Sequence, residues 1–186
     1  MSDGQRADAR RNYARILAVA EEEVANHGSG ASLEQIARTA NVGSATVRRH
    51  FPTRRALLEA VSAKRIAVLC ARAVELTGGE DSRKALLTWL DEVVTYCVTA
   101  RGLAAALSYD ETDPTHENSC SAAIEEAGDP LLRQAVRDGA VAPEVTVAEL
   151  ITLIVGIVLA TEHHPDPAAQ ADRLFRLAVA GLSPRT

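Results

Sequence analysis

Four arginines and one histidine lie within eight consecutive positions of the sequence, at Arg48, Arg49, His50, Arg54 and Arg55. A guanidinium group can bind a phosphate through two parallel hydrogen bonds, and it can bind O6 and N7 of guanine in the same way. The whole chain has a formal net charge of -5, so the cluster is a local feature. By itself, a cluster of this kind is also typical of a solvated basic face.

The charge is unevenly divided along the chain. Residues 1–65 contain 11 Lys and Arg and 7 Asp and Glu, whereas residues 66–186 contain 9 and 18. This division favours a first part that meets a polyanion and a second part that does not. The preference for arginine, with 18 Arg and 2 Lys, fits phosphate recognition, but it also fits a GC-rich genome.

The elements that position the basic cluster are expected to be helices. Ala, Leu, Arg and Glu are abundant, aromatic residues make up 3%, and sustained alternation of apolar and polar residues is missing. The sequence therefore predicts an all-α protein. We expect helices over residues 9–26, 32–40, 44–50, 53–77, 82–99, 102–109, 117–127, 130–138, 143–161 and 167–181, with Thr53 as a cap and a break at Gly128, Asp129 and Pro130.

The cluster follows a pattern of two short helices joined by a tight turn. Ser32 and Gln35, three positions apart, predict a capping box at the start of the first helix. Asn41 tolerates a positive φ and can make the turn. The small Ala37 and the apolar Val47 can face each other where the two helices cross. The pattern indicates a helix-turn-helix unit.

The second short helix would carry much of the cluster on its outer side. With Val47 turned inward, a rotation of about 100° per residue places its neighbours outside. Such a helix enters the major groove in helix-turn-helix proteins, and Ser44, its expected N-cap, can bond a phosphate. On this basis we expect DNA contacts from Ser44, Ala45, Thr46, Arg48, Arg49, Arg54 and Arg55, and from an arm with Arg6, Arg10, Arg11 and Arg15.

The segments RILAVAEEEVANHG, SLEQIARTANVG and HFPTRRALL follow one another in this region. With the residues between them, they resemble the DNA-binding head of the TetR family of bacterial repressors over residues 10–61. The resemblance implies that Ser32 and Thr46 contact the DNA backbone and that His50 reaches a phosphate. At position 48 the family usually has a phosphate-binding tyrosine. This chain has Arg48 there, which can hold the phosphate or reach a base.

The same resemblance implies the organisation of the chain. A helix-turn-helix DNA-binding domain would cover residues 1–55, and a long helix would join it to an effector-binding and dimerisation domain over residues 56–186. The implied function is that of a transcriptional repressor, a homodimer that binds a palindromic operator in double-stranded DNA and is released by a ligand. The segment LLRQAVRDGAVAPEVTVAELITLIVGIVLAT resembles, more weakly, the C-terminal domain of an actinobacterial subgroup of the family.

The acidic part contains a candidate dimer interface. The segment from Val145 to Ala160 is apolar on almost every side, and Gly156 would allow another helix to approach closely. A contact with a second copy and an ordinary buried helix are both compatible with this pattern. The residues expected at the interface are Leu150, Leu153, Ile154, Ile157, Val158, Leu174, Leu177 and Ala178.

The resemblance to the TetR family implies an effector pocket between the long helix and these last helices. The chain's few aromatic residues gather there among apolar ones, which would suit a small hydrophobic molecule. Core packing explains the same residues equally well. The residues expected to contact the effector are Trp89, Tyr96, Cys97, Leu103, Leu107 and Tyr109.

Other functional classes have weaker support. The sequence contains no nucleotide-binding, hydrolase or zinc-protease motif, so we expect no enzyme, catalytic residue, metal site or cofactor. A nucleoid protein with the same head and no ligand stays an alternative. Three scattered cysteines and the lack of an apolar leader or spanning segment predict a reduced, cytoplasmic protein without membrane contact. We expect solvated loops at Asp110, Glu111, Asp113, Glu117, His163 and His164, and no redox role for Cys120.

Overall fold

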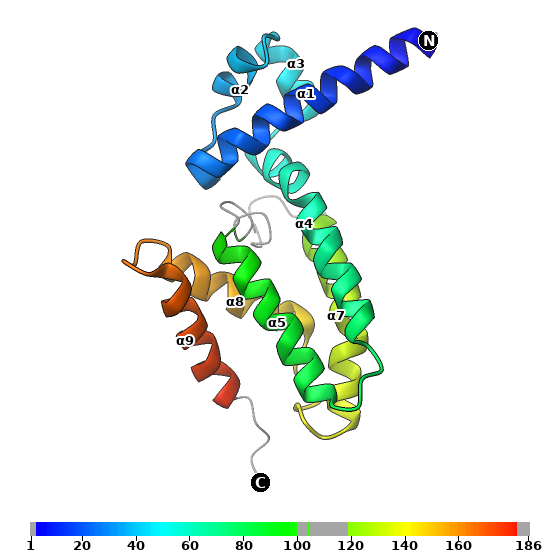
Figure 1. Ribbon diagram of the computed structural model, residues 1–186, viewed down its shortest axis with the longest axis vertical. Helices are drawn as coiled ribbons and strands as arrows, with labels where there is room; N and C mark the ends of the chain where they lie inside the picture. Colours follow the sequence, from blue (N-terminus) through cyan, green and yellow to red (C-terminus); the bar gives the residue numbers. More distant parts are fainter. Residues whose placement is uncertain (1–2, 100–103, 105–118, 182–186) are drawn as a thin grey trace.

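The computed structural model describes residues 3–99, 104 and 119–181 (Figure 1). Over these residues the chain is helical and contains no strand, so the prediction of an all-α protein is confirmed. The helices are α1 (Asp3–His27), a 3₁₀ turn η1 (Gly28–Gly30), α2 (Leu33–Thr39), α3 (Ser44–His50), α4 (Arg54–Leu76), α5 (Ser82–Thr99), α7 (Ser119–Arg137), α8 (Val147–Thr161) and α9 (Pro167–Gly181).

The helices form two groups in an elongated molecule (Figure 1). α1, α2 and α3 lie together at one end, and we call them, with the first two turns of α4, the head. α4 runs from the head into the second group, the body, which also contains α5, α7, α8 and α9. The predicted architecture, a helix-turn-helix head joined by a long helix to a helical C-terminal part, is confirmed.

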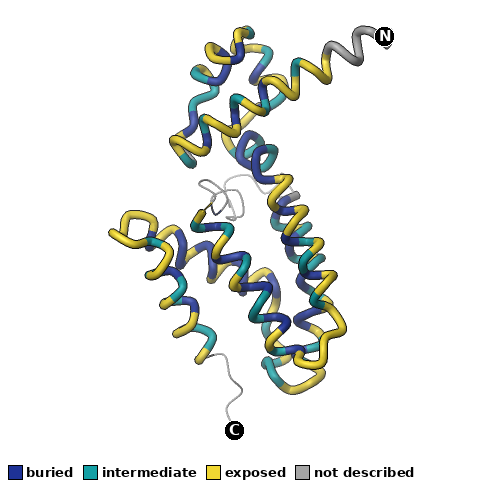
Figure 2. Tube along the Cα trace, viewed as in Figure 1, coloured by how far each residue is buried: buried dark blue, intermediate teal, exposed yellow. Residues whose placement is uncertain are grey.

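Head and body have separate cores of buried side chains. Buried residues occur in both groups of helices (Figure 2). α4 contributes to both cores, since its apolar positions Leu57 and Val61 belong to the head and Ile66 and Leu69 to the body. α4 is therefore packed into both groups. The buried residues of the head core are Ile16, Ala20, Val24, Ala31, Ile36, Ala37, Ala40, Val47, Phe51, Leu57, Leu58 and Val61.

The start of α2 confirms half of the predicted capping box. Ser32 Oγ accepts a hydrogen bond from the backbone N–H of Gln35 at 3.3 Å, as expected. The prediction of the reciprocal bond, from the N–H of Ser32 to the Gln35 side chain, is wrong. The N–H of Ser32 instead donates to Glu23 Oε1 of α1 at 3.2 Å, and the Gln35 side chain donates to Thr39. A tertiary contact has thus replaced the local partner, and it joins α1 to the start of α2.

The turn between α2 and α3 forms where the sequence predicts it. Asn41 has φ 50°, a conformation that asparagine tolerates better than most residues. The expected N-cap of α3 is wrong by one residue, because Gly43 occupies that position and Ser44 is the first helical residue. Thr53 caps α4 as predicted, since its side chain accepts from the N–H of Ala56 at 3.1 Å.

The predicted break at Gly128, Asp129 and Pro130 is wrong, because α7 continues through these residues. Pro130 removes one backbone donor from the helix. Ile124 and Leu131, on either side of it, are both buried in the body core, and this packing offsets the lost hydrogen bond. Tertiary burial has overridden a local stop signal.

α8 begins four residues later than predicted. Thr146 caps it, and Thr146 and Glu149 form a complete capping box with hydrogen bonds of 3.2 and 2.9 Å. Glu149, which interrupts the apolar run of the sequence, therefore has a local role at the start of the helix. The helix expected over 102–109 lies, except for Ala104, outside the described residues. In the described part of the chain, no helix combines the length and apolarity needed to cross a membrane.

Candidate nucleic-acid interface

α3 is held in the head by its inward side. Val47 is completely buried, and it packs in the same core as Ile36 and Ala37 of α2. The turn is closed by a hydrogen bond of 3.0 Å from the N–H of Val42 to the carbonyl of Ala37. This arrangement fixes which side of α3 faces away from the head.

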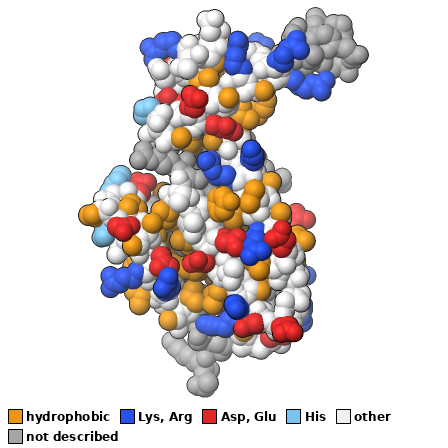
Figure 3. Space-filling model, in the orientation of Figure 1, with side chains coloured by type: hydrophobic (Ala, Val, Ile, Leu, Met, Phe, Trp, Pro, Cys, Tyr) orange, Lys and Arg blue, Asp and Glu red, His pale blue; other side chains and the backbone are white. Residues whose placement is uncertain are grey.

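The outward side of α3 carries the basic cluster. Ser44, Ala45, Arg48 and Arg49 are exposed, as is Arg54 at the start of α4. Thr46 and His50 are half-buried at the edges of this surface. Lys and Arg side chains are visible on the head in Figure 3. We call the exposed surface formed by Ser44, Ala45, Arg48, Arg49 and Arg54 the α3 face.

Arg48 forms an ion pair across the turn, which the sequence analysis did not anticipate. Its Nη2 lies 2.5 Å from Oε1 of Glu34, in the first turn of α2. A hydrogen bond from its own backbone lowers the pKa of Glu34, and the guanidinium of Arg48 lowers that pKa further. Glu34 is therefore a carboxylate that lies against the α3 face.

Arg55 does not belong to the exposed cluster, and its predicted contact with DNA stays a prediction. Its Nε lies 3.2 Å from Oε1 of Glu59, one turn along α4, and the two side chains are only 17% and 12% exposed. The carbonyl of Glu59 also accepts from Cys120 Sγ at 3.7 Å. Arg55 thus lies where α4 meets the start of α7, and its i,i+4 spacing to Glu59 was a local signal for this pair.

The structure adds Tyr13 to the surroundings of α3. Its ring meets the ring of His50 edge-on, with centroids 5.3 Å apart, and lies 6.0 Å from the ring of Phe51. Tyr13 precedes the buried Ile16 by three residues, so helical periodicity could have placed it on the inner side of α1. Ser32 is half-buried, and its hydroxyl is engaged as the cap of α2. Arg10, Arg11 and Arg15 are exposed along α1.

Comparison with known families agrees with this geometry. Residues 16–61 match the family of bacterial regulatory proteins named after TetR. Residues 81–184, more than half of the chain, match the C-terminal domain of SbtR-like TetR transcriptional regulators. The chain belongs to the TetR family of transcriptional regulators. A comparison with curated proteins gave no match.

Several solved structures, among them TetR-family regulators, resemble the chain over nearly its whole length. A TetR transcriptional regulator from Streptomyces coelicolor is 32% identical, with 92% of this chain and 98% of that chain covered and a TM-score of 0.57. A regulator of the family from Rhodococcus RHA1 is 21% identical, with coverage of 94% and 98% and a TM-score of 0.62. RolR in complex with resorcinol is 15% identical, with coverage of 97% and 96% and a TM-score of 0.62. The last two show similarity of fold.

The residues predicted to bind an effector in this TetR-family body are mostly core residues where the structure describes them. Trp89 is fully buried, and its Nε1 donates to the carbonyl of Leu69 at 3.0 Å. Cys97 is also buried, and burial raises the pKa of its thiol to about 12. Tyr96 is half-buried, while Leu103, Leu107 and Tyr109 lie outside the described residues. Trp89 and Cys97 thus belong to the body core, and their contact with an effector stays a prediction.

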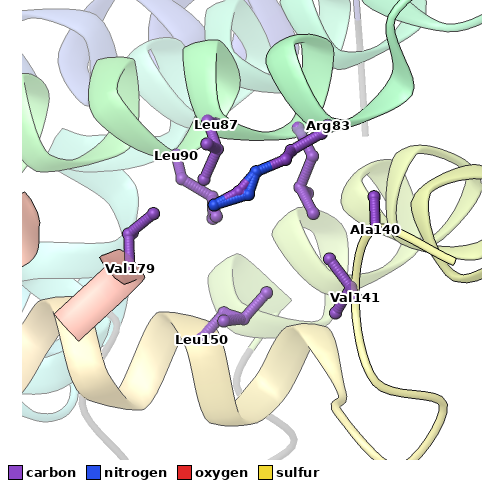
Figure 4. Close-up of a pocket in the computed structure, with 8 residues that line it drawn as sticks. Arg83, Leu87, Leu90, Ala140, Val141, Leu150 and Val179 are labelled. Atoms are coloured by element: carbon purple, nitrogen blue, oxygen red, sulfur yellow. The ribbon is translucent and has the colours of Figure 1, made fainter. Parts of the chain in front are cut away.

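A small pocket opens elsewhere in the body, between α5, the connection from α7 to α8, α8 and α9 (Figure 4). Its walls are almost entirely apolar, and Arg83 extends across it. The space open to the centre of a water molecule is about 20 Å³, so little more than one small group fits without movement. The lining residues are Arg83, Leu86, Leu87, Leu90, Ala140, Val141, Leu150 and Val179.

The predicted dimer residues of this TetR-family chain divide into two sets. Leu150, Ile154, Ile157 and Val158 are buried in the protomer's own core, and their place at an interface stays a prediction. Leu153 and Leu177 are 37% and 59% exposed, and the sequence analysis missed Leu159, which is 41% exposed. Leu174 and Ala178 are half-buried, and the exposed Gly156 has open space where a Cβ would lie.

The sequence also pointed to several acidic residues, two histidines and Cys120. Among the described residues, no group of three His, Cys, Asp or Glu side chains could hold a metal ion. Asp110, Glu111, Asp113 and Glu117 lie outside that part of the chain. His163 and His164 are exposed in the connection between α8 and α9. Cys120 is buried at the contact between α7 and α4.

Proposed function

We propose that this TetR-family chain is a transcriptional repressor that binds a palindromic operator as a homodimer and releases it when a small apolar effector occupies the body. The observation that carries the proposal is the α3 face, an exposed basic surface on a helix that Val47 anchors in the head. A helix held in this way can enter the major groove while its arginines contact bases or phosphates. The proposed DNA-binding residues are Ser32, Ser44, Ala45, Thr46, Arg48, Arg49, His50 and Arg54.

Arg49 gives the direct test of the α3 face. Arg49→Ala is expected to weaken operator binding by about 1–3 kcal/mol, because it removes a contact to a base edge or a desolvated phosphate. Genomic fragments that the purified protein retains supply the operator for this measurement. The affinity of the unaltered protein should also fall steeply with salt, since phosphate contacts release bound cations.

A matched control for this variant is Arg133→Ala. Arg133 is exposed on α7, in the body, and its loss changes the net charge by the same amount. Fluorescence anisotropy with a labelled operator should show a loss for Arg49→Ala only. Equal affinities for the two variants would remove Arg49 from the interface, and a flat plot of log K against log salt would contradict phosphate binding by the head. Equal retention of all genomic fragments would favour a nucleoid protein.

The outer surface of α8 and α9 supports the homodimer. Leu153 and Leu159 of α8 and Leu177 of α9 are exposed, and α8 packs against α9. Gly156 lies on the same exposed side of α8, where the missing side chain allows a second helix to come close. Two copies of this surface would bury their leucines against each other in a symmetric contact.

Leu177 offers a test that spares the protomer's fold. Leu177→Asp is expected to yield monomers, because it places a charge in the apolar contact, while its 59% exposure lets the protomer tolerate the change. Sedimentation velocity distinguishes the two states. Val74→Asp is the matched control, because Val74 is 72% exposed on α4, away from α8 and α9. A dimeric Leu177→Asp protein would show that the interface lies elsewhere.

Effector release is supported by the path of α4. This helix contributes side chains to both cores, so a ligand that moves α4 in the body also moves the α3 face. The ligand must prefer the arrangement that does not bind DNA, and a coupling of about 1–3 kcal/mol is typical. The pocket beside Arg83 has apolar walls that suit an apolar ligand, and it would have to widen to admit one. RolR, which shares the fold, was solved with the small molecule resorcinol.

A further inference from the structure

The ion pair between α2 and α3 places a carboxylate on the surface that would face DNA. We propose that Glu34 competes with DNA phosphates for Arg48, and that it thereby suppresses binding to duplexes that lack the operator. This inference rests on the proposed binding of DNA by the α3 face. It assigns to Glu34 a role in specificity, through Arg48, at the position where the sequence departs from the tyrosine usual in the family.

The pair is a tertiary contact that the fold of the head creates. Glu34 and Arg48 are 14 residues apart, and the turn at Asn41 brings α2 and α3 together so that Arg48 Nη2 reaches Glu34 Oε1 at 2.5 Å. The other oxygen of the carboxylate, Oε2, lies 3.5 Å from Ser32 Oγ. Both oxygens of Glu34 therefore have a donor nearby, and the carboxylate is held beside Arg48.

Solvent exposure shows that the pair can open. The side chains of Arg48 and Glu34 are 55% and 63% exposed. An ion pair so open to water contributes little to folding stability, because water solvates both groups almost as well when they separate. The pair can therefore open, and free Arg48 to bind another group, without unfolding the head.

The chemistry of the guanidinium group makes the competition direct. Carboxylate and phosphate both bind a guanidinium through anionic oxygens in the same geometry. When Arg48 turns to a phosphate, it must leave Glu34, and an uncompensated carboxylate then lies close to the negative DNA backbone. Among the described residues, the exposed Arg49 and Arg54 have no such ion pair. The restraint thus acts selectively on Arg48.

This competition should affect the two kinds of DNA complex differently. Binding without sequence preference depends almost entirely on phosphate contacts, so neutralising one arginine reduces it strongly. In an operator complex, base contacts by the other residues of the α3 face and favourable DNA shape hold the protein while Arg48 keeps its pair with Glu34, so this complex does not pay for opening the pair. Glu34 should therefore widen the gap between operator and other DNA.

The test uses the full-length protein and a labelled duplex of random sequence. Glu34→Gln is expected to tighten binding to this duplex about 5- to 10-fold at about 0.1 M salt, because one added phosphate contact steepens the salt slope by about 0.9. Binding to a retained genomic fragment should tighten less. The matched control is Glu22→Gln, which removes the same charge from an exposed position on α1 and should change affinity less than about 2-fold. In an Arg48→Gln background, Glu34→Gln should have no larger effect than this control.

Three results would overturn the proposal. Equal effects of Glu34→Gln and Glu22→Gln on affinity would show that Glu34 acts only through the overall charge of the protein. If Glu34→Gln raised the affinity just as much in the Arg48→Gln background, Glu34 would not act through Arg48. Weaker binding by Glu34→Gln would mean that Glu34 positions Arg48 for DNA. The proposed function fails in a different way, namely if the unaltered protein, with its helical circular dichroism intact, binds neither duplex.

Discussion

Trp89→Ala is expected to lower the free energy of unfolding of the body by about 3–5 kcal/mol, the usual range for the loss of a buried aromatic side chain. Trp89 is 0% exposed, and its indole N–H is bonded to the carbonyl of Leu69 on α4. The ring also lies against Gly128, where an added Cβ would come within 2.4 Å of it. The indole thus joins α5 to both α4 and α7. Urea denaturation followed by circular dichroism measures the change.

Gly128 supplies the control for this packing. In a helix interior alanine is normally more stable than glycine by about 0.5–1 kcal/mol. Gly128→Ala should nevertheless destabilise the unaltered body, because its Cβ would clash with the Trp89 ring and come within 3.0 Å of Val147 Cγ1. In the Trp89→Ala background the same change should cost much less or become favourable. An equal cost in both backgrounds, or a loss below about 1 kcal/mol for Trp89→Ala, would contradict this account of the core.

Val47→Asp is expected to weaken operator binding strongly while the body stays folded. Val47 is completely buried, so the change places an unpaired carboxylate in the head core at a cost of about 3 kcal/mol or more. If the folded head falls to a minor population, the apparent affinity falls in proportion, by about 100-fold. Operator binding and thermal unfolding of the same protein check the two parts of this prediction.

The separate cores make the second part specific. The head core ends at Val61 of α4 and the body core begins at Ile66, so the body should keep its own thermal transition. Val74→Asp, at a 72% exposed position of α4, is the control and should leave both operator binding and unfolding nearly unchanged. Retained operator binding by Val47→Asp would show that α3 is not the recognition element. Simultaneous loss of the body would show that the two cores unfold as one.

Local signals in the sequence predicted much of the fold. α5 and α9 have the predicted bounds, and the turn at Asn41 and the cap at Thr53 are confirmed, because each depends on residues only a few positions apart. The continuous α7 was missed because burial on both sides of Pro130 decided it. The reciprocal half of the capping box at Ser32 was missed because Glu23, on another helix, took its place.

The candidate DNA site shows the same division. The expectation that Val47 faces inward also predicted that Arg48 and Arg49 are exposed, since a helix rotates by a constant angle per residue. The pair between Arg48 and Glu34 depends on how α2 and α3 are brought together, and 14 residues of separation hide it from any helical period. The i,i+4 pair of Arg55 and Glu59 was within reach of the sequence.

α8 marks the limit of what the sequence by itself determined about this protein. Its apolar composition established a helix that must be covered on most sides, and the family resemblance indicated a second copy as one cover. The sequence did not determine which residues of α8 are buried in the protomer. The packing of α8 against α5, α7 and α9 decided this, because it buried Leu150 and Ile154 and left Leu153 and Leu159 exposed. A helix that is apolar all round has no periodic signal to separate these sides, so only the contacts of its neighbours can distinguish them.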